Sequence, residues 1–136
     1  MKSFEDFCAD LEAKIQATYQ EGVTMEEAEK LAAEFLNAQL QVSKELKRAD
    51  LDARARKSGV KAIRAAIYLE ILQKNGEGKK PTEAAMAATI DSDKIVIGEQ
   101  QSLDEAEVNR AELERYYDVF LNSHIYFRGI AKGSFN

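Results

Sequence analysis

The residues that could do chemistry in this chain are cationic, and most of them lie between residues 44 and 80. This segment holds eleven Lys or Arg side chains against five Asp or Glu, a net charge of +6, in a protein whose overall net charge is −5. Clustered Lys and Arg side chains raise the local potential and attract polyanions. The segment therefore predicts an anionic partner, although the same residues could equally form the solvated face of a long helix.

Charge alone selects five of these side chains as candidates for contact with a polyanion. They are Arg54, Arg56, Lys57, Lys79 and Lys80. The last two follow the glycines of the 75–81 loop, which lacks the G-x-x-x-x-G-K-[ST] spacing of a nucleotide-triphosphate loop. Two interpretations of this loop stay open: an ordinary solvated turn, or a loop that closes over a nucleic-acid backbone.

The sequence offers no set of side chains for catalysis or for a metal. A single histidine, His124, and a single cysteine, Cys8, exclude a His-based metal cluster, a Cys–His nucleophile pair, an internal disulfide and a Cys-based zinc site. Both residues lie on apolar helical faces, which favours packing over chemistry. We therefore expect no enzyme activity, no catalytic residue, no metal and no cofactor.

Helix-forming residues dominate the 136-residue chain, which has one proline and seven glycines. This composition predicts an all-α fold of long helices with short connections and coiled-coil-like packing, in a single helical domain over residues 1–136. A chain this short buries a modest core, so assembly as a homo-oligomer would help it. No apolar run approaches the roughly 18–20 residues that span a bilayer, and acidic residues follow Phe4 where a signal peptide would be apolar. We expect a cytoplasmic protein with no membrane partner.

Helix signals begin near the N-terminus. One helix is expected over residues 3–20, and a second begins at the capping box of Thr24 and Glu27 and runs to about Lys57. Apolar residues recur along the second at spacings of three and four, close to the 3.5-residue repeat of a coiled coil. These are Ala28, Leu31, Phe35, Ala38, Val42, Leu46, Ala49 and Ala53. Such a seam predicts a partner helix, in the same chain or in another subunit.

The middle of the chain combines a glycine with an unusually apolar segment. Ser58-Gly59 predicts a kink or break, since Gly costs about 1 kcal/mol relative to Ala inside a helix. Residues 60–72 are apolar nearly all round, which predicts a helix at the centre of the fold or of an oligomer interface. Thr82 caps a short helix, and the β-branched run 95–97 is either a short strand or an apolar plug.

A capping box at Ser102 and Glu105 predicts a last helix from Leu103 to about Arg128, ended by Gly129. Its expected inner face is rich in aromatic side chains. This face consists of Ala106, Leu113, Tyr117, Phe120, Leu121, His124 and Phe127. Such a stripe is typical of a core, and the alternatives are a stacking surface for bases or an oligomer contact.

Several local stretches of the chain resemble the recombination mediator proteins of T4-type phages. Phe35-Leu36-Asn37, followed by Lys44-Glu45-Leu46, is similar to the aromatic-Leu-Asn and Lys-Glu-apolar segment of that family at the same separation. Lys61-Ala62-Ile63-Arg64 resembles the family's basic Lys-Ala-Arg patch, with one extra residue inside it. Ser92-Asp93-Lys94 before an apolar run and a long helix resembles its second half. The resemblance covers residues 25–130.

The resemblance implies an all-helical protein that binds single-stranded DNA and contacts phosphate through Lys61 and Arg64. It also implies a protein that helps to load a recombinase onto DNA covered by single-strand-binding protein. Family members form ring-shaped homo-oligomers, and a phage-encoded member would act in the host cytoplasm. The alternative is a helical oligomeric structural or adaptor protein without nucleic-acid binding, which the seam and the lack of catalytic residues support.

Overall fold

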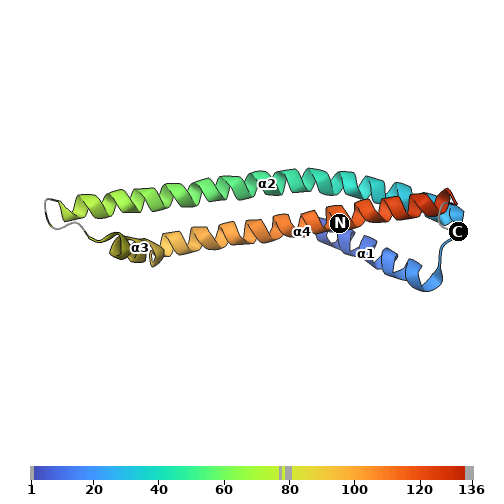
Figure 1. The fold of residues 1–136 in the computed structure, drawn as a ribbon, viewed down its shortest axis with the longest axis horizontal. Coiled ribbons are helices and arrows are strands. Elements are labelled where there is room, and N and C mark those ends of the chain that lie inside the picture. The colour runs from blue at the N-terminus through green and yellow to red at the C-terminus, as the bar shows by residue number, and fades with distance from the viewer. Residues whose placement is uncertain (1, 77, 79–80, 134–136) are drawn as a thin grey trace. The chain divides into compact units, whose positions relative to one another are not determined.

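The structure is a computed structural model that describes residues 2–76, 78 and 81–133. The described residues form four helices and no strand (Figure 1). The helices are α1 (Phe4–Glu21), α2 (Met25–Asn75), α3 (Glu83–Asp91) and α4 (Lys94–Ala131). The prediction of an all-α fold with long helices is therefore confirmed.

Hydroxyl side chains begin the first three helices, as their positions in the sequence predict. Ser3 accepts a hydrogen bond from the backbone N–H of Asp6 at 3.1 Å, and Thr24 accepts one from Glu27 at 3.1 Å. Thr82 caps α3 in the same way. Each hydroxyl satisfies a backbone donor that has no partner within the first turn of the helix.

Helix α2 continues through Gly59, so of the kink or break predicted at Ser58-Gly59 the break is wrong and the kink stays a prediction. Strong helix formers lie within three residues on both sides of this glycine, Arg56 and Lys57 before it and Lys61 and Ala62 after it, and Val60 beside it is buried. The cost of one glycine, about 1 kcal/mol, is small against the cooperative hydrogen bonding of a helix of this length.

Helix α4 begins at Lys94, nine residues earlier than the sequence predicts. The carboxylate of Asp93 accepts backbone hydrogen bonds from Ile95 at 2.8 Å and Val96 at 3.3 Å, and so caps the helix. Residues 95–97 are therefore helical, neither strand nor plug, and the predicted start at Leu103 is wrong. The predicted end at Gly129 is also wrong, since the helix continues to Ala131.

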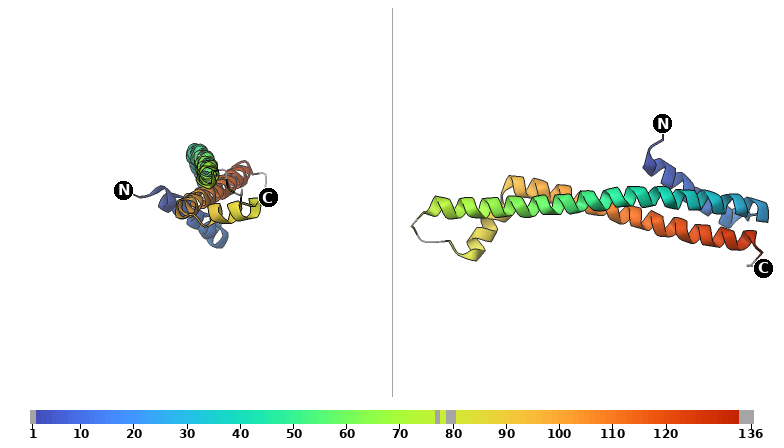
Figure 2. Two further views of the ribbon diagram at one scale, coloured as in Figure 1. Left: turned by 90° about the vertical axis from the view of Figure 1, so that its left-hand side faces the viewer. Right: turned by 90° about the horizontal axis from the view of Figure 1, so that it is seen from above.

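The chain divides into two compact units, and α2 and α4 each contribute to both. Unit 1 comprises Met1–Lys47 with Glu112–Asn136, and unit 2 comprises Arg48–Ala111. In unit 1, α1 packs beside the first part of α2 and the last part of α4 (Figure 2). Phe35 at the centre of this unit is fully buried, with its ring 5.6 Å from that of Phe127 and 5.7 Å from that of Phe120.

Unit 2 has a thinner core in which α2, α3 and α4 contribute small and medium-sized side chains. Its buried residues are Ala49, Ala53, Val60, Met86, Ile90, Val96, Leu103 and Ala106. They recur at spacings of three, four and seven along α2 and α4, which is the repeat of coiled-coil packing. The seam predicted for α2 is confirmed at Ala49 and Ala53, and in unit 1 at Phe35 and Val42.

The segment 60–72 is not buried on several sides in this fold, contrary to the sequence prediction. Only Val60 in it is buried, and Leu69 is 58% exposed. The reason is that α3 and α4 cover α2 on one side only, so the alanines of this segment face outward. Burial of the segment in an oligomer interface stays a prediction.

Candidate nucleic-acid interface

Four cations of unit 2 lie along one side of α2. Arg54, Lys57, Lys61 and Arg64 follow one another at spacings of three and four residues, which places their side chains on one face of a helix with 3.6 residues per turn. They cover about 15 Å of the helix at 1.5 Å per residue. We call these four residues the basic side. Arg56 lies two residues from Arg54, about 200° around the helix, and so faces elsewhere.

The three arginines among the predicted binding residues already hold carboxylates. Arg54 pairs with Asp50 at 3.1 Å and Arg56 with Asp52 at 3.1 Å, both one helical turn away. Arg64 donates to the carboxylate of Asp91, at the end of α3, at 2.8 Å. Each pair lowers the charge that its arginine can offer to a polyanion.

Lys57 and Lys61 differ from these arginines. Both side chains are exposed, and neither forms an ion pair with a described residue. They are one turn apart, about 6 Å along the helix axis. They are therefore the cations of the basic side that are most available to an anionic partner. Lys79 and Lys80 lie outside the described residues, so their contribution stays a prediction.

Tyr68 extends the basic side by one turn and was not among the residues predicted from the sequence. It follows Arg64 by four residues, and its hydroxyl donates a long hydrogen bond, 3.5 Å, to the carboxylate of Glu83 on α3. An aromatic ring at the end of a row of cations is suited to stacking against a base. The spacing of four from Arg64 is the signal that could have identified it.

A cavity of about 310 Å³ lies beside the basic side in unit 2. Its wall includes Arg64, Asp91 and Asp104 together with the side chains of Gln100 and Gln101. Because two carboxylates accompany a single arginine there, the cavity does not add positive potential to the basic side. The usable positive surface is therefore centred on Lys57 and Lys61.

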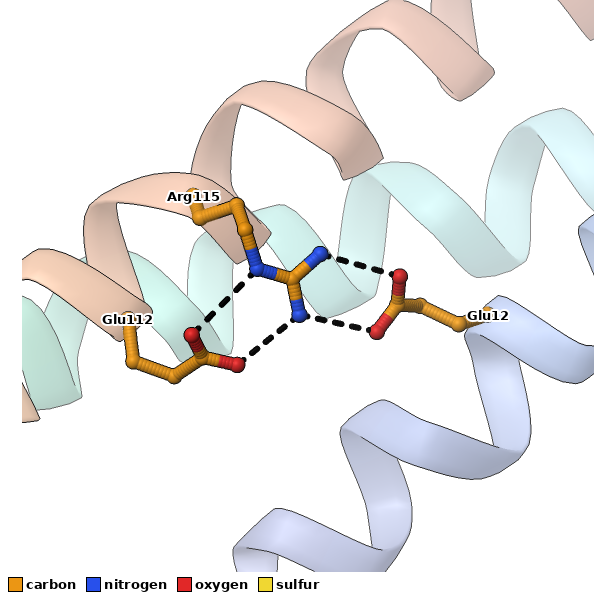
Figure 3. Close-up of polar contacts among 3 residues, drawn as sticks. All are labelled: Glu12, Glu112 and Arg115. Carbon is orange, nitrogen blue, oxygen red and sulfur yellow. Dashed lines mark hydrogen bonds and ion pairs between the residues drawn. The ribbon is translucent and has the colours of Figure 1, made fainter.

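A network of charged hydrogen bonds in unit 1 joins α1 to α4 and has a structural role (Figure 3). The guanidinium of Arg115 donates two hydrogen bonds of 3.0 Å to Glu12, and two more, of 2.8 Å and 3.3 Å, to Glu112. These hydrogen bonds lower the pKa of both carboxyls, and the two carboxylates raise the pKa of Arg115. The arrangement resembles a clamp, because one planar cation holds carboxylates from two helices.

The two residues that could have been reactive are packed, as the sequence analysis favoured. His124 donates from Nδ1 to the carbonyl of Ala32 at 2.8 Å. Cys8 is fully buried, and this burial raises the pKa of its thiol to about 11. A thiol with so high a pKa is a poor nucleophile near neutral pH.

The described part of the chain contains no group of three or more His, Cys, Asp or Glu side chains placed to hold a metal ion. Within the same residues, none of the helices has the length and apolar character needed to cross a membrane.

Comparison with known proteins adds no assignment. The chain matches no family model, and no curated protein or solved structure is significantly similar to it.

Proposed function

We propose that this protein binds single-stranded DNA through the basic side of α2 and acts as a recombination mediator. The observation that supports the proposal is the pair of exposed lysines, Lys57 and Lys61, one turn apart and without carboxylate partners among the described residues. Arg54 and Arg64 flank them, and each is paired with a carboxylate, that of Asp50 and that of Asp91. Tyr68 adds an aromatic surface at one end.

Binding by one copy of the chain is weak in this proposal. Each phosphate contact with a single strand contributes a slope of about −0.7 to the dependence of log affinity on log salt. Two lysines therefore give a slope of about −1.4 for one copy. A homo-oligomer, for instance a ring, would repeat the patch and supply the missing affinity through avidity.

The mediator role rests on the resemblance of residues 25–130 to the phage recombination mediators. In that role the protein would help to load a strand-exchange recombinase onto DNA that single-strand-binding protein covers. The partners proposed are therefore single-stranded DNA, the recombinase and the single-strand-binding protein. No catalytic residue, metal or cofactor is part of the proposal.

The direct test is an oligothymidine titration of a Lys57→Glu, Lys61→Glu double variant by fluorescence anisotropy at low and high salt. We expect affinity at least about tenfold weaker than that of the wild type, because two phosphate contacts become repulsive. The matched control, Lys30→Glu with Lys94→Glu, changes net charge by the same amount at two other exposed lysines. Equal affinities for the two double variants would show that the basic side does not bind the DNA.

The second candidate is a helical oligomeric adaptor without nucleic-acid binding. Exposed apolar side chains such as Leu51 (57%), Leu69 (58%) and Val108 (70%) favour it, because they are suited to a protein partner. If the wild type binds no oligothymidine even at low salt but assembles in solution, this candidate replaces the first.

A further inference from the structure

The cavity beside Arg64 has a size and a lining that suit a small planar ligand. Its volume, about 310 Å³, lies within the range of about 300–1,000 Å³ that is typical of small-molecule sites. Arg64 of α2, Asp91 at the end of α3 and five residues of α4 between Val96 and Asp104 form its walls. All of these residues belong to unit 2, and Arg64 is also part of the basic side.

The polar side chains of the cavity keep hydrogen-bonding capacity that their neighbours do not use. Arg64 donates to one oxygen of Asp91 at 2.8 Å, and Gln100 donates to one oxygen of Asp104 at 2.9 Å. The second oxygen of each carboxylate accepts no hydrogen bond from any residue that the structure describes, and the amide of Gln101 has no partner there either. A ligand that satisfies these groups therefore presents adjacent N–H donors together with an acceptor for an amide.

The apolar part of the wall is suited to the face of a ring. Val96 is buried, and Ile97 beside it is 45% exposed, so a branched aliphatic surface faces the solvent at this point. The amides and carboxylate of the same wall follow along α4, where they can meet the edge of a ring that lies on Ile97. A planar heterocycle with hydrogen-bonding groups on its edge has this chemistry, and an unstacked base of a single strand is such a group.

The carboxylates discriminate among the four bases. A carboxylate only accepts hydrogen bonds, and its strongest contacts are with two adjacent N–H donors. Guanine carries such a pair, N1–H and the N2 amino group, with O6 beside them as an acceptor for an amide. Adenine, cytosine and thymine each place an acceptor next to the donor on this edge, and a carboxylate repels that acceptor.

We propose that the cavity binds one guanine base of a strand whose phosphates lie along Lys57 and Lys61, with the Asp104 carboxylate accepting from N1–H and the N2 amino group. The inference rests on the proposed function and adds a base preference to it. Lys61 precedes Arg64 by three residues, about 4.5 Å along the helix axis, so a strand on the lysines passes close to the cavity. The hydrogen bond from Gln100 holds the Asp104 carboxylate in place.

A cationic side chain of a protein partner is the other group that two carboxylates could accept. The location of the cavity argues against it, because the exposed Lys57 and Lys61 lie on the adjoining side of α2 and repel a basic segment. The same two lysines attract the phosphates of a strand. The surroundings of the cavity therefore favour a base.

The test compares three oligothymidines by fluorescence anisotropy at one salt concentration: unmodified, with one central guanine, and with one central hypoxanthine. Hypoxanthine is guanine without the N2 amino group, so it offers one donor where guanine offers two. We expect the wild type to bind the guanine strand about fivefold or more tighter than either of the others, because a two-donor contact discriminates by at least that factor.

Two variants with the same change of charge test the residue assignment. Asp104→Asn places an amide donor where the carboxylate accepts, so the ratio of guanine to hypoxanthine affinities should fall to about one. Its affinity for unmodified oligothymidine should not decrease, since the lysine contacts remain. Glu105→Gln, at the next exposed position of α4, should keep the wild-type ratio. Equal affinity of the wild type for the guanine and hypoxanthine strands, or an undiminished ratio in Asp104→Asn, would overturn the inference.

The outcomes also separate this inference from the proposed function. If all three strands bind the wild type equally, the guanine site is wrong and the binding function stands. If no strand binds, the proposed function is wrong, and an NMR titration with deoxyguanosine monophosphate decides about the cavity. Shifts of the Gln101 side-chain amide that disappear in Asp104→Asn would support the guanine site. An unchanged spectrum, or shifts with an arginine-rich peptide alone, would overturn it.

Discussion

Units 1 and 2 use the same two long helices in different ways. In unit 1, Phe35, Phe120 and Phe127 fill the space between helices, and the Arg115 clamp fastens α1 to α4. In unit 2 the core consists largely of alanine, valine and single larger residues such as Met86. Large buried rings contribute most to stability, whereas a thin core leaves more of α2 facing solvent.

This difference indicates where function is to be sought. In unit 1 the largest aromatic side chains are buried in the core, and the Arg115 ion pairs join two of its own helices. These groups are therefore not available to bind a partner. Unit 2 leaves two parts of the α2 surface exposed, the basic side and the apolar side chains of Leu51 and Leu69. The predictions below test whether unit 1 is the stable part of the chain and unit 2 the part that makes external contacts.

The largest expected effect is on the aromatic core of unit 1. Phe35→Ala removes a ring with no exposed surface and should lower the free energy of unfolding by about 3–5 kcal/mol. Val60→Ala in unit 2 removes two buried carbons and should cost about 1.5 kcal/mol. Urea denaturation followed by circular dichroism measures both. Equal losses for the two variants would contradict the contrast between the cores.

The Arg115 clamp should make a smaller, acid-sensitive contribution. Arg115→Gln should cost about 1 kcal/mol near neutral pH, because the pairs are partly exposed to solvent. Arg115 holds the pKa of Glu12 and Glu112 below its ordinary value of 4.5, so this stabilisation is present above that pH. It is lost as pH falls through the lowered pKa. Urea midpoints between neutral pH and about pH 3 should therefore converge for wild type and variant; a constant gap would refute the clamp.

Two glycines should respond in opposite directions to substitution by alanine. At Gly59, inside α2, a Cβ would meet nothing within 4 Å, so Gly59→Ala should raise the free energy of unfolding by about 0.5–1 kcal/mol. Gly22 ends α1 with φ of 74°, which an alanine adopts only with strain. Gly22→Ala should therefore lower stability. A destabilising Gly59→Ala would mean that the helix bends at this position.

The smallest expected effect concerns a polar residue in the seam of α4. Arg110 lies 3.5 Å from Asp50, where the heptad repeat would place an apolar side chain. Arg110→Met should change stability by less than about 1 kcal/mol, because Asp50 keeps its pair with Arg54 and the seam gains an apolar residue. Denaturation midpoints test this, and a loss above about 2 kcal/mol would show that the polar seam position is structurally required.

The sequence predicted those features that depend on near neighbours. Ser3, Thr24 and Thr82 mark helix starts because a cap acts within one turn. The pairs Asp50–Arg54 and Asp52–Arg56 were also predictable, since opposite charges four residues apart meet on a helix. The same spacing makes both arginines weaker candidates for contact with a polyanion, because each is paired within its own helix.

Features that depend on competition or on distant segments were not predictable in this way. Both Asp93 and Ser102 are suitable caps, and the helix begins at the earlier one, where Val96 of its first turn is buried in unit 2. The pairing of Arg64 with Asp91 joins residues 27 positions apart, which no local spacing reveals. The distinction between engaged arginines and available lysines therefore required the structure.

That distinction is tested most directly by the salt dependence of oligothymidine affinity for the wild type, Lys61→Ala and Arg64→Ala. We predict salt-sensitive binding by the wild type. In Lys61→Ala the slope of log affinity against log salt should be smaller in magnitude by about 0.7 for each phosphate contact that is lost. Arg64→Ala should keep nearly the wild-type slope, because Asp91 already engages this arginine. Salt-insensitive binding by the wild type, or an equal loss of slope in both variants, would contradict the assignment of the basic side.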